Sequence, residues 1–452
     1  MRLTQHSDSH REEARPRQKK GEDRQYSPTV AIVLEPDLRG PAAEGQRRSA
    51  ADRLLEAEGL ARAIDLNIVH SAIVPVAKPQ PATLFGAGKV EEIAGIVTAS
   101  EAGLVVVDHA LTPVQQRNLE KEWNAKVLDR TGLILEIFGE RAQTKEGSLQ
   151  VELAHLNYQK GRLVRSWTHL ERQRGGAGFL GGPGETQIEA DRRILQDTIK
   201  NLERELESVR RTRTLHRSKR KKVPLPIVSL VGYTNAGKST LGHRLTGAEV
   251  MAENMLFATL DPTLRRVRLP GGTWIILSDT VGFISDLPTH LVAAFRATLE
   301  EVQEADVVLH VRDMSSSATK EEAADVAEIL RDLDIDPDDE DHVIEVWNKI
   351  DAIVPEERAE LVARAERSAT GPSIAAVSAI TGEGIDRLLA EIETRISGKL
   401  VARRFSIPPE RGADLAWLYD HGQVRHRETA DDGTVTVDIE MTSDNAAAFE
   451  RR

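Results

Sequence analysis

The chain has 452 residues, 40% of them hydrophobic, which is enough for two to four domains with separate cores. It contains no cysteine, which excludes a disulfide framework and a thiolate metal site. The formal net charge of −12 argues weakly against nucleic acid as a partner, and no apolar run approaches the roughly 18 residues of a membrane span.

The first 26 residues are polar and lack the apolar segment of a signal peptide. We expect residues 1–26 to form a disordered tail. The expected location is the cytoplasm, with peripheral attachment to a membrane surface as the alternative.

Residues 27–147 alternate strand patterns with helical patterns. The runs "TVAIVLE", "NIVHSAIVPV" and "LVVVD" predict strands, and "AADRLLEAEGLARAI" and "PVQQRNLEKEW" predict helices. This alternation predicts an α/β domain with a mostly parallel sheet. Within it, "FGAGKVEEI" places Gly86, Gly88 and Lys89 before a helix but lacks the spacer and hydroxyl of a phosphate loop. A turn that opens a helix is the favoured interpretation.

Residues 148–222 contain two helical stretches around the glycine-rich run "RQRGGAGFLGGPGETQ". Apolar residues recur with 4-3 spacing in both stretches, which favours two helices packed side by side. Capping-box spacing suggests that the second helix starts near Thr186. We expect an antiparallel helical hairpin with a glycine-rich tip, and the alternative is a connector with a floppy loop.

The predicted hairpin with its basic linker, residues 148–222, is called the arm below, and it is basic within an acidic protein. Residues 150–222 hold 17 Lys and Arg against 9 Asp and Glu, a balance of 17 − 9 = +8, which leaves −12 − 8 = −20 for the rest. The run from Arg210 to Lys222 is either a solvated linker or a contact to a phosphate backbone. Glycines would let backbone amides approach phosphates and bases. The candidate RNA-binding residues are Arg172, Arg174, Gly175, Gly176, Gly178, Gly181, Gly182, Arg192 and Arg193.

Residues 223–398 have the pattern of an α/β nucleotide-binding domain. The run "IVSLVGYTNAGKSTL" fits GxxxxGK[ST] between an apolar strand and a helix. Such a loop wraps backbone amides around phosphates, while Lys238 neutralises the outer phosphate oxygens and Ser239 ligates magnesium (Mg2+).

Companion motifs follow in order. In "WNKID", the Asp351 carboxylate can accept both guanine N1–H and the exocyclic amine, which selects guanine over adenine. In "SDTVGF", Asp279 is expected to hold magnesium through water and Gly282 to sense the γ-phosphate. Thr259 of "FATLD" is the candidate switch threonine on the metal.

The sequence thus yields a full set of site residues. The expected catalytic residues are Lys238, Thr259 and Gly282, and the expected metal ligands are Ser239, Thr259 and Asp279. The expected nucleotide-binding residues are Gly232, Tyr233, Thr234, Asn235, Ala236, Gly237, Lys238, Ser239, Thr240, Phe257, Ala258, Thr259, Leu260, Asp261, Asp279, Thr280, Val281, Gly282, Asn348, Lys349, Ile350, Asp351, Ser378, Ala379 and Ile380.

Phe283 stands where many Ras-like GTPases carry the glutamine that orients the attacking water. Phenylalanine cannot hydrogen-bond a water, so backbone groups or a partner must position it. We therefore expect intrinsic GTP hydrolysis to be slow and to accelerate when the protein docks on its partner.

Residues 399–452 predict a small α+β domain. A helical pattern, "ERGADLAWLYDHG", precedes a hairpin that turns at Asp432 and Gly433. The run offers no recognisable chemistry.

The runs "VGYTNAGKSTL", "LFATLDPTLRRV", "DTVGFISDLP" and "GGPGETQIEADRR" resemble the HflX GTPases. The resemblance implies binding of GTP and GDP, and GTP hydrolysis coupled to the large ribosomal subunit and its rRNA. It also implies splitting or rescue of stalled or stressed ribosomes. HflX proteins carry a hydrophobic residue at the position of Phe283, and some are credited with ATP binding by the N-terminal domain.

Two points stay open beside this resemblance. Potassium-dependent GTPases share "NAGKS", so Asn235 either helps to bind a monovalent cation (K+) or only stabilises its loop. The alternative function is an RNA-binding assembly or checkpoint factor for the large subunit, in which GTP times release.

Overall fold

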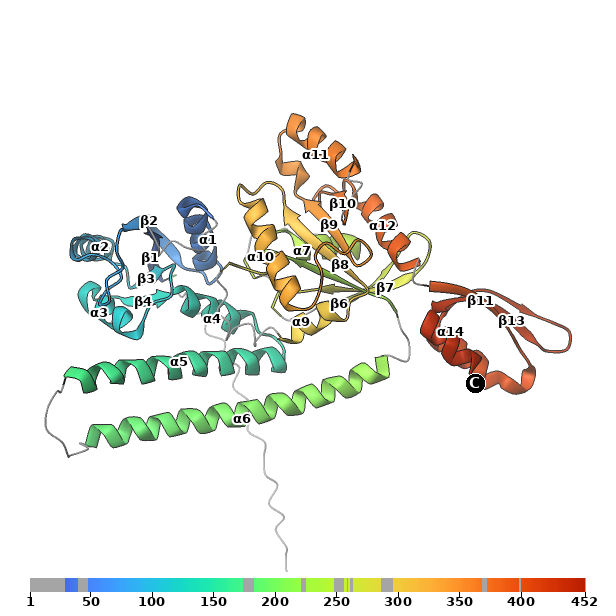
Figure 1. The fold of residues 1–452 in the computed structure, drawn as a ribbon, viewed down its shortest axis with the longest axis horizontal. Coiled ribbons are helices and arrows are strands. Elements are labelled where there is room, and N and C mark those ends of the chain that lie inside the picture. Colours follow the sequence, from blue (N-terminus) through green and yellow to red (C-terminus); the bar gives the residue numbers. More distant parts are fainter. Residues whose placement is uncertain are drawn as a thin grey trace, which may run out of the picture.

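The computed structural model describes residues 29–39, 48–173, 183–220, 225–247, 256–257, 259–260, 263–285, 296–367, 372–397 and 400–451. It has an N-terminal domain, a long helical arm, a G domain and a small C-terminal domain (Figure 1). The C-terminal domain lies at the far side of the G domain from the N-terminal domain. The tail expected at residues 1–26 lies outside the described residues.

The N-terminal domain is built on a four-stranded parallel sheet in the order β2-β1-β3-β4, which confirms the α/β prediction. Its strands are β1 (Val30–Leu38), β2 (Asn67–Val76), β3 (Leu104–Val107) and β4 (Lys126–Asp129). Its helices are α1 (Ala50–Arg62), α2 (Ala87–Ser100), α3 (Pro113–Trp123) and α4 (Arg130–Arg141). Gly86 is the N-cap residue of α2, as expected for a turn that opens a helix, and Lys89 pairs with Glu92 on the helix surface.

The two faces of this sheet are buried differently. On one face, Ile32, Val105 and Val107 pack with residues of α2 and α3, including Val97 and Trp123. On the other face, residues of α1 and α4 join a cluster that continues into the G domain. The N-terminal domain and the G domain therefore share one hydrophobic core.

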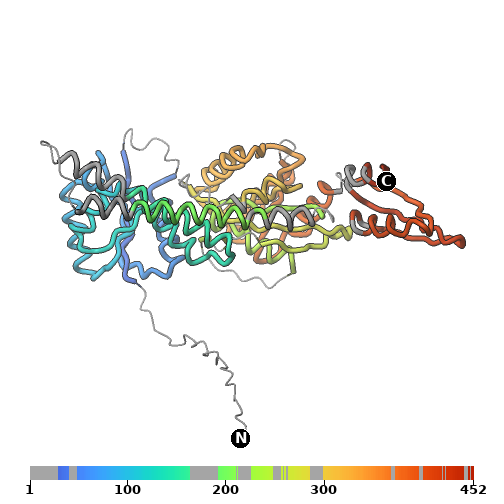
Figure 2. The backbone as a smooth tube through the Cα atoms, turned by 90° about the horizontal axis from the view of Figure 1, so that it is seen from below, coloured from blue at the N-terminus to red at the C-terminus, as the bar shows by residue number. Residues whose placement is uncertain are grey.

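The arm consists of α5 (Lys145–Gln173) and α6 (Pro183–Arg220). The two helices run antiparallel and side by side in both views (Figure 1, Figure 2). Leu149 near the start of α5 packs against Leu202 and Leu206 in the middle of α6, as the heptad spacing predicted. α6 begins before Thr186 and extends to Arg220, so the basic run up to that residue is helical. The glycine-rich residues 174–182 lie outside the described residues.

The G domain has a six-stranded sheet in the order β10-β9-β8-β5-β7-β6, in which β6 alone is antiparallel to its neighbour. Its strands are β5 (Ile227–Gly232), β6 (Thr263–Arg268), β7 (Trp274–Asp279), β8 (Val307–Asp313), β9 (Val343–Asn348) and β10 (Ser373–Ala376). The helices are α7 (Lys238–Leu245), α9 (Arg296–Gln303), α10 (Thr319–Asp332), α11 (Pro355–Arg367) and α12 (Ile385–Ser397), with a short 3-10 turn η3 (Ile350–Ala352). The predicted motifs follow the carboxyl ends of β5, β7 and β9, where open α/β sheets bind ligands.

The C-terminal domain is a three-stranded antiparallel sheet in the order β11-β13-β12 with helices packed against it. Its elements are β11 (Leu400–Ile407), η4 (Pro409–Arg411), α13 (Gly412–His421), β12 (Gln423–Thr429), β13 (Val435–Thr442) and α14 (Ser443–Glu450). Gly433 has φ +83°, which supports the predicted hairpin turn. Within the described part of the chain, no helix has the length and apolarity to cross a bilayer.

Candidate nucleotide site

The phosphate loop joins β5 to α7, and its shape depends on two glycines. Gly232 has φ +152°, and a Cβ there would lie 2.2 Å from the carbonyl oxygen of Val311. Gly237 has φ +87°, and a Cβ there would lie 2.3 Å from Nδ2 of Asn348. No other residue type fits either position without displacing its neighbours.

Lys238 is buried at the start of α7, and its side chain extends back to the beginning of the phosphate loop. Its Nζ donates to the carbonyl oxygens of Gly232 at 3.0 Å and Tyr233 at 2.7 Å. Burial lowers the pKa of Lys238 to about 8, with Asp279 opposing and Lys349 adding to that shift. The ammonium group is thus placed at the mouth of the loop, where an anion would favour its charged form.

The three predicted metal ligands lie together. The Ser239 and Thr259 hydroxyl oxygens are 2.9 Å apart, and the Thr259 hydroxyl donates to Oδ2 of Asp279 at 3.0 Å. The other oxygen, Oδ1 of Asp279, is buried and has no hydrogen-bond partner among the described residues. Two hydroxyls and a carboxylate form the all-oxygen set that suits magnesium. Burial raises the pKa of the Asp279 carboxyl, and a bound cation would reverse that effect.

The base-recognition motifs converge on Asn348, which is 1% exposed. Its Nδ2 donates to the carbonyl oxygen of Ala236 at 2.9 Å, and its Oδ1 accepts from the Ala379 amide at 3.1 Å. Asn348 therefore ties the phosphate loop to the "SAI" segment. The Ser378 hydroxyl donates to Oδ1 of Asp351 at 2.6 Å, which orients the carboxylate expected to accept from guanine.

Arg244 is a residue that the sequence did not single out. Its Nε donates to the carbonyl oxygen of Ala379 at 2.9 Å, and its Nη2 contacts the carbonyl oxygen of Ile380. Arg244 lies in the last turn of α7, so it holds the base-side loop from the phosphate-loop helix.

Phe283 is held against the phosphate loop by its backbone. Its N–H donates to the carbonyl oxygen of Gly232 at 3.1 Å, and its carbonyl oxygen accepts from the Thr234 amide at 2.7 Å. A Cβ on Gly282 would lie 2.9 Å from Thr234 and 3.0 Å from Nζ of Lys238. The backbone at residues 282–283 thus lies directly beside the residues expected to contact the γ-phosphate.

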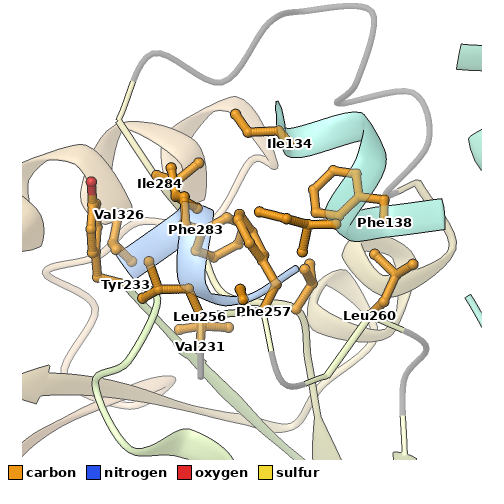
Figure 3. Packing of buried hydrophobic residues seen from close by; sticks show 14 of the residues in the cluster. Ile134, Phe138, Val231, Tyr233, Leu256, Phe257, Leu260, Phe283, Ile284 and Val326 are labelled. Carbon is orange, nitrogen blue, oxygen red and sulfur yellow. The ribbon is translucent and has the colours of Figure 1, made fainter. Parts of the chain in front are cut away.

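The Phe283 side chain is 3% exposed and belongs to the core shared by the two domains. Figure 3 shows it among Phe257 of the G domain and Ile134 and Phe138 of α4. Phe138 and Phe257 meet edge to face, with ring centroids 4.9 Å apart. At the position of the usual glutamine, this chain therefore places an interdomain packing residue.

Most of the predicted nucleotide residues are described, and they gather around this loop. Tyr233 contributes its backbone there, while its side chain is directed into the N-terminal domain. Ala258 and Asp261 lie outside the described residues. Of the candidate RNA-binding residues, Arg192 and Arg193 are exposed on α6, Arg172 belongs to α5, and residues 174–182 are not described. The phosphate loop, the oxygen cluster and the "NKID" segment define the class of protein, a P-loop GTPase.

Comparison with known proteins gives the family. Residues 51–139 match the family model "GTP-binding GTPase N-terminal", 141–220 the "GTP-binding GTPase Middle Region", 227–349 the "50S ribosome-binding GTPase" and 360–452 the "HflX C-terminal domain". The chain is 50% identical to GTPase HflX of Magnetococcus marinus, over 87% of this chain and 89% of that protein. It is 45% identical to GTPase HflX of Escherichia coli, over 80% of this chain and 83% of that protein. The chain belongs to the HflX family, and it is a GTPase.

A solved structure offers a more distant likeness. A GTP-binding protein from the archaeon Sulfolobus solfataricus, in complex with GDP, is 22% identical to this chain. The match covers 82% of this chain and 99% of that protein, with a TM-score of 0.44.

Proposed function

We propose that this GTPase binds the large ribosomal subunit and separates stalled or stressed ribosomes into subunits. The observation that carries the proposal is the arm, two long helices that pack side by side and flank the glycine-rich run in the sequence. The match of residues 227–349 to a family described as 50S ribosome-binding supports the partner. A stiff, basic hairpin is suited to entering folded RNA and displacing what it meets there.

The chemistry assigned to the site is positioning and charge neutralisation. Lys238 and the loop amides would bind the phosphates, and Ser239, Thr259 and Asp279 would hold magnesium, which supplies positive charge beside the transferred phosphate. The attacking water would be placed by the backbone of residues 282–283, since the Phe283 side chain points into the core. GTP would be selected over ATP by Asp351, with Ser378 fixing its carboxylate.

Asn235 has a further proposed role at the loop. It has φ +59° and is exposed at the outer turn of the phosphate loop. Its amide oxygen is available to a monovalent cation, and K+ there would add charge that a catalytic side chain does not supply. The alternative is that Asn235 only stabilises the left-handed turn, which asparagine tolerates better than most residues.

The test removes residues 175–182 and measures two activities on one preparation. Splitting is followed by sucrose-gradient profiles of whole ribosomes with a non-hydrolysable GTP analogue, and intrinsic hydrolysis by phosphate release. We expect splitting to be lost and intrinsic hydrolysis to be nearly unchanged. Matched replacement of Arg192 and Arg193 by glutamine should weaken binding and lower the salt dependence by about 0.7 to 0.9 per lost phosphate contact.

Two outcomes would contradict the proposal. Wild-type splitting by the deletion variant would make the arm a connector. Tight binding to the large subunit by wild-type protein without any splitting would favour the assembly or checkpoint factor, in which GTP times release.

A further inference from the structure

Two adjacent residues at the start of α4 face different parts of the molecule. Asp129 ends β4 and caps α4, because its Oδ1 accepts from the Gly132 amide at 2.8 Å. Arg130 is the first residue of the helix. Asp129 is 2% exposed and Arg130 is 8% exposed, so both interact with protein rather than with solvent.

Asp129 holds the arm. The Tyr158 hydroxyl donates to Oδ1 of Asp129 at 2.6 Å, and Nη2 of Arg162 donates to Oδ2 at 2.6 Å. The Arg162 guanidinium also lies over the Tyr158 ring, 4.2 Å from its centroid. Both partners belong to α5, so the arm is fixed to the first turn of α4 by a buried carboxylate.

Arg130 holds the segment that follows Phe283. Its Nη2 donates to the carbonyl oxygen of Ser285 at 2.9 Å. Its Nη1 donates to both carboxylate oxygens of Asp108, at 2.7 and 2.9 Å, and Nη2 also contacts Glu56. Asp108 and Glu56 keep the guanidinium in place, and the remaining contact reaches across to the G domain.

Ser285 is also hydrogen-bonded to Tyr233, a residue of the phosphate loop. The Tyr233 hydroxyl accepts from the Ser285 amide at 2.8 Å and donates to Oε2 of Glu56 at 2.6 Å. Nη1 of Arg48 donates to the same hydroxyl at 2.9 Å. Both backbone polar groups of Ser285 are therefore bound by one buried network that the two domains share.

We propose that the pair Asp129–Arg130 couples the arm to GTP hydrolysis. Arg130 is a positioning residue: it fixes Ser285, and through the preceding backbone it fixes residues 282–283 beside Lys238. Asp129 transmits displacement of α5 to Arg130, since the two are neighbours at the rigid end of one helix. Packed interiors shift between discrete arrangements rather than deforming smoothly, so a tilt of the arm changes this network as a unit.

The network includes Tyr233 of the phosphate loop, so a nucleotide that shifts this loop should also change the arm. Such reciprocity applies to binding free energies, and it is therefore tested by exchanging the bound nucleotide. The biological meaning rests on the proposed function, in which RNA engages the arm. The coupling itself needs only protein and nucleotide. If the coupling test fails, the proposal that the protein splits ribosomes is unaffected. If the splitting test fails, the proposed coupling between arm and nucleotide site is unaffected.

The first experiment is hydrogen exchange on the full chain with GDP or a non-hydrolysable GTP analogue. In wild-type protein, exchange in residues 145–162 should differ between the two nucleotides. The double variant Tyr158→Phe/Arg162→Gln should lose that difference while its nucleotide affinities stay within about twofold. The control is Arg211→Gln on α6, where the exposed Arg211 pairs with Glu207 of the same helix. It should keep the wild-type response.

The second experiment replaces Arg130 by lysine, which keeps one charge but cannot bridge Asp108, Glu56 and Ser285 together. We expect kcat for intrinsic hydrolysis to fall at least about fivefold, the lower range of allosteric coupling, with KM for GTP unchanged. An Arg130→Lys protein with wild-type kcat would overturn the positioning role. If this variant does not fold, the exchange test decides: identical arm exchange in both nucleotides, or a wild-type response in the double variant, overturns the coupling.

Discussion

Replacing Phe283 by alanine separates packing from chemistry at the position where other GTPases carry glutamine. The side chain is 3% exposed in the core that the N-terminal domain and G domain share. Truncation of a buried phenylalanine costs about 3 to 5 kcal/mol, because apolar contacts are lost and a cavity remains. We expect a loss in this range in urea unfolding followed by circular dichroism.

Hydrolysis should respond far less. The Phe283 side chain packs in the interdomain core, so its loss should change the single-turnover rate of saturated protein by less than about tenfold, or about 1.4 kcal/mol of barrier. Phe283→Leu, the matched control, should recover most of the stability. Phe283→Gln should not accelerate hydrolysis, because its amide would enter the apolar core. A collapse of the single-turnover rate in a Phe283→Ala protein that is still folded and binds GTP with wild-type affinity would refute this reasoning, as would acceleration of hydrolysis in Phe283→Gln.

Three further predictions concern the site and the N-terminal sheet. Asp351→Asn should weaken GTP binding at least about tenfold by calorimetry, because an amide presents donors where guanine also donates; equal affinities would remove the assignment. Potassium should speed hydrolysis relative to sodium at matched ionic strength if Asn235 seats a cation, and identical rates would exclude this role. Burial, and then the Asp108 carboxylate, raises the pKa of Glu35 from 4.5 to about 8. Between those values only the folded state holds the proton, so stability should fall with rising pH by up to about 1.4 kcal/mol per unit. Glu35→Gln should flatten the dependence of the urea midpoint on pH. An unchanged dependence would show that the raised pKa of Glu35 does not cause it.

The nucleotide site was predictable because its recognition elements are local. The residues from Gly232 to Ser239 are expected to bind through backbone amides, the Lys238 ammonium and the Ser239 hydroxyl at fixed spacing, and Asn348 and Asp351 are three positions apart. Such spacings are visible in a single chain, and the fold then brings the segments together at one edge of a sheet. The heptad seam of the arm was equally visible, since Leu202 and Leu206 lie four residues apart.

The contacts between domains could not be predicted in this way. Arg130 and Ser285 are separated by 155 positions, and Glu56 and Tyr233 by 177. No local pattern links such partners, and a charged residue on a helix is ordinarily a solvated one. Phe283 was noticed for the chemistry it cannot perform, but the core that it fills depends on α4, which is distant in the chain.

The shared core also has a consequence for synthesis of the protein. Residues of α4 such as Ile134 and Phe138 emerge early, and the partners that cover them, Phe257 and Phe283, emerge roughly 120 to 150 residues later. At about 5 to 20 residues per second, the nascent N-terminal domain waits on the order of ten seconds with an apolar face uncovered. During that interval the growing chain is a substrate for chaperones and a risk for aggregation. Chains that terminate before residue 257 keep this face permanently open.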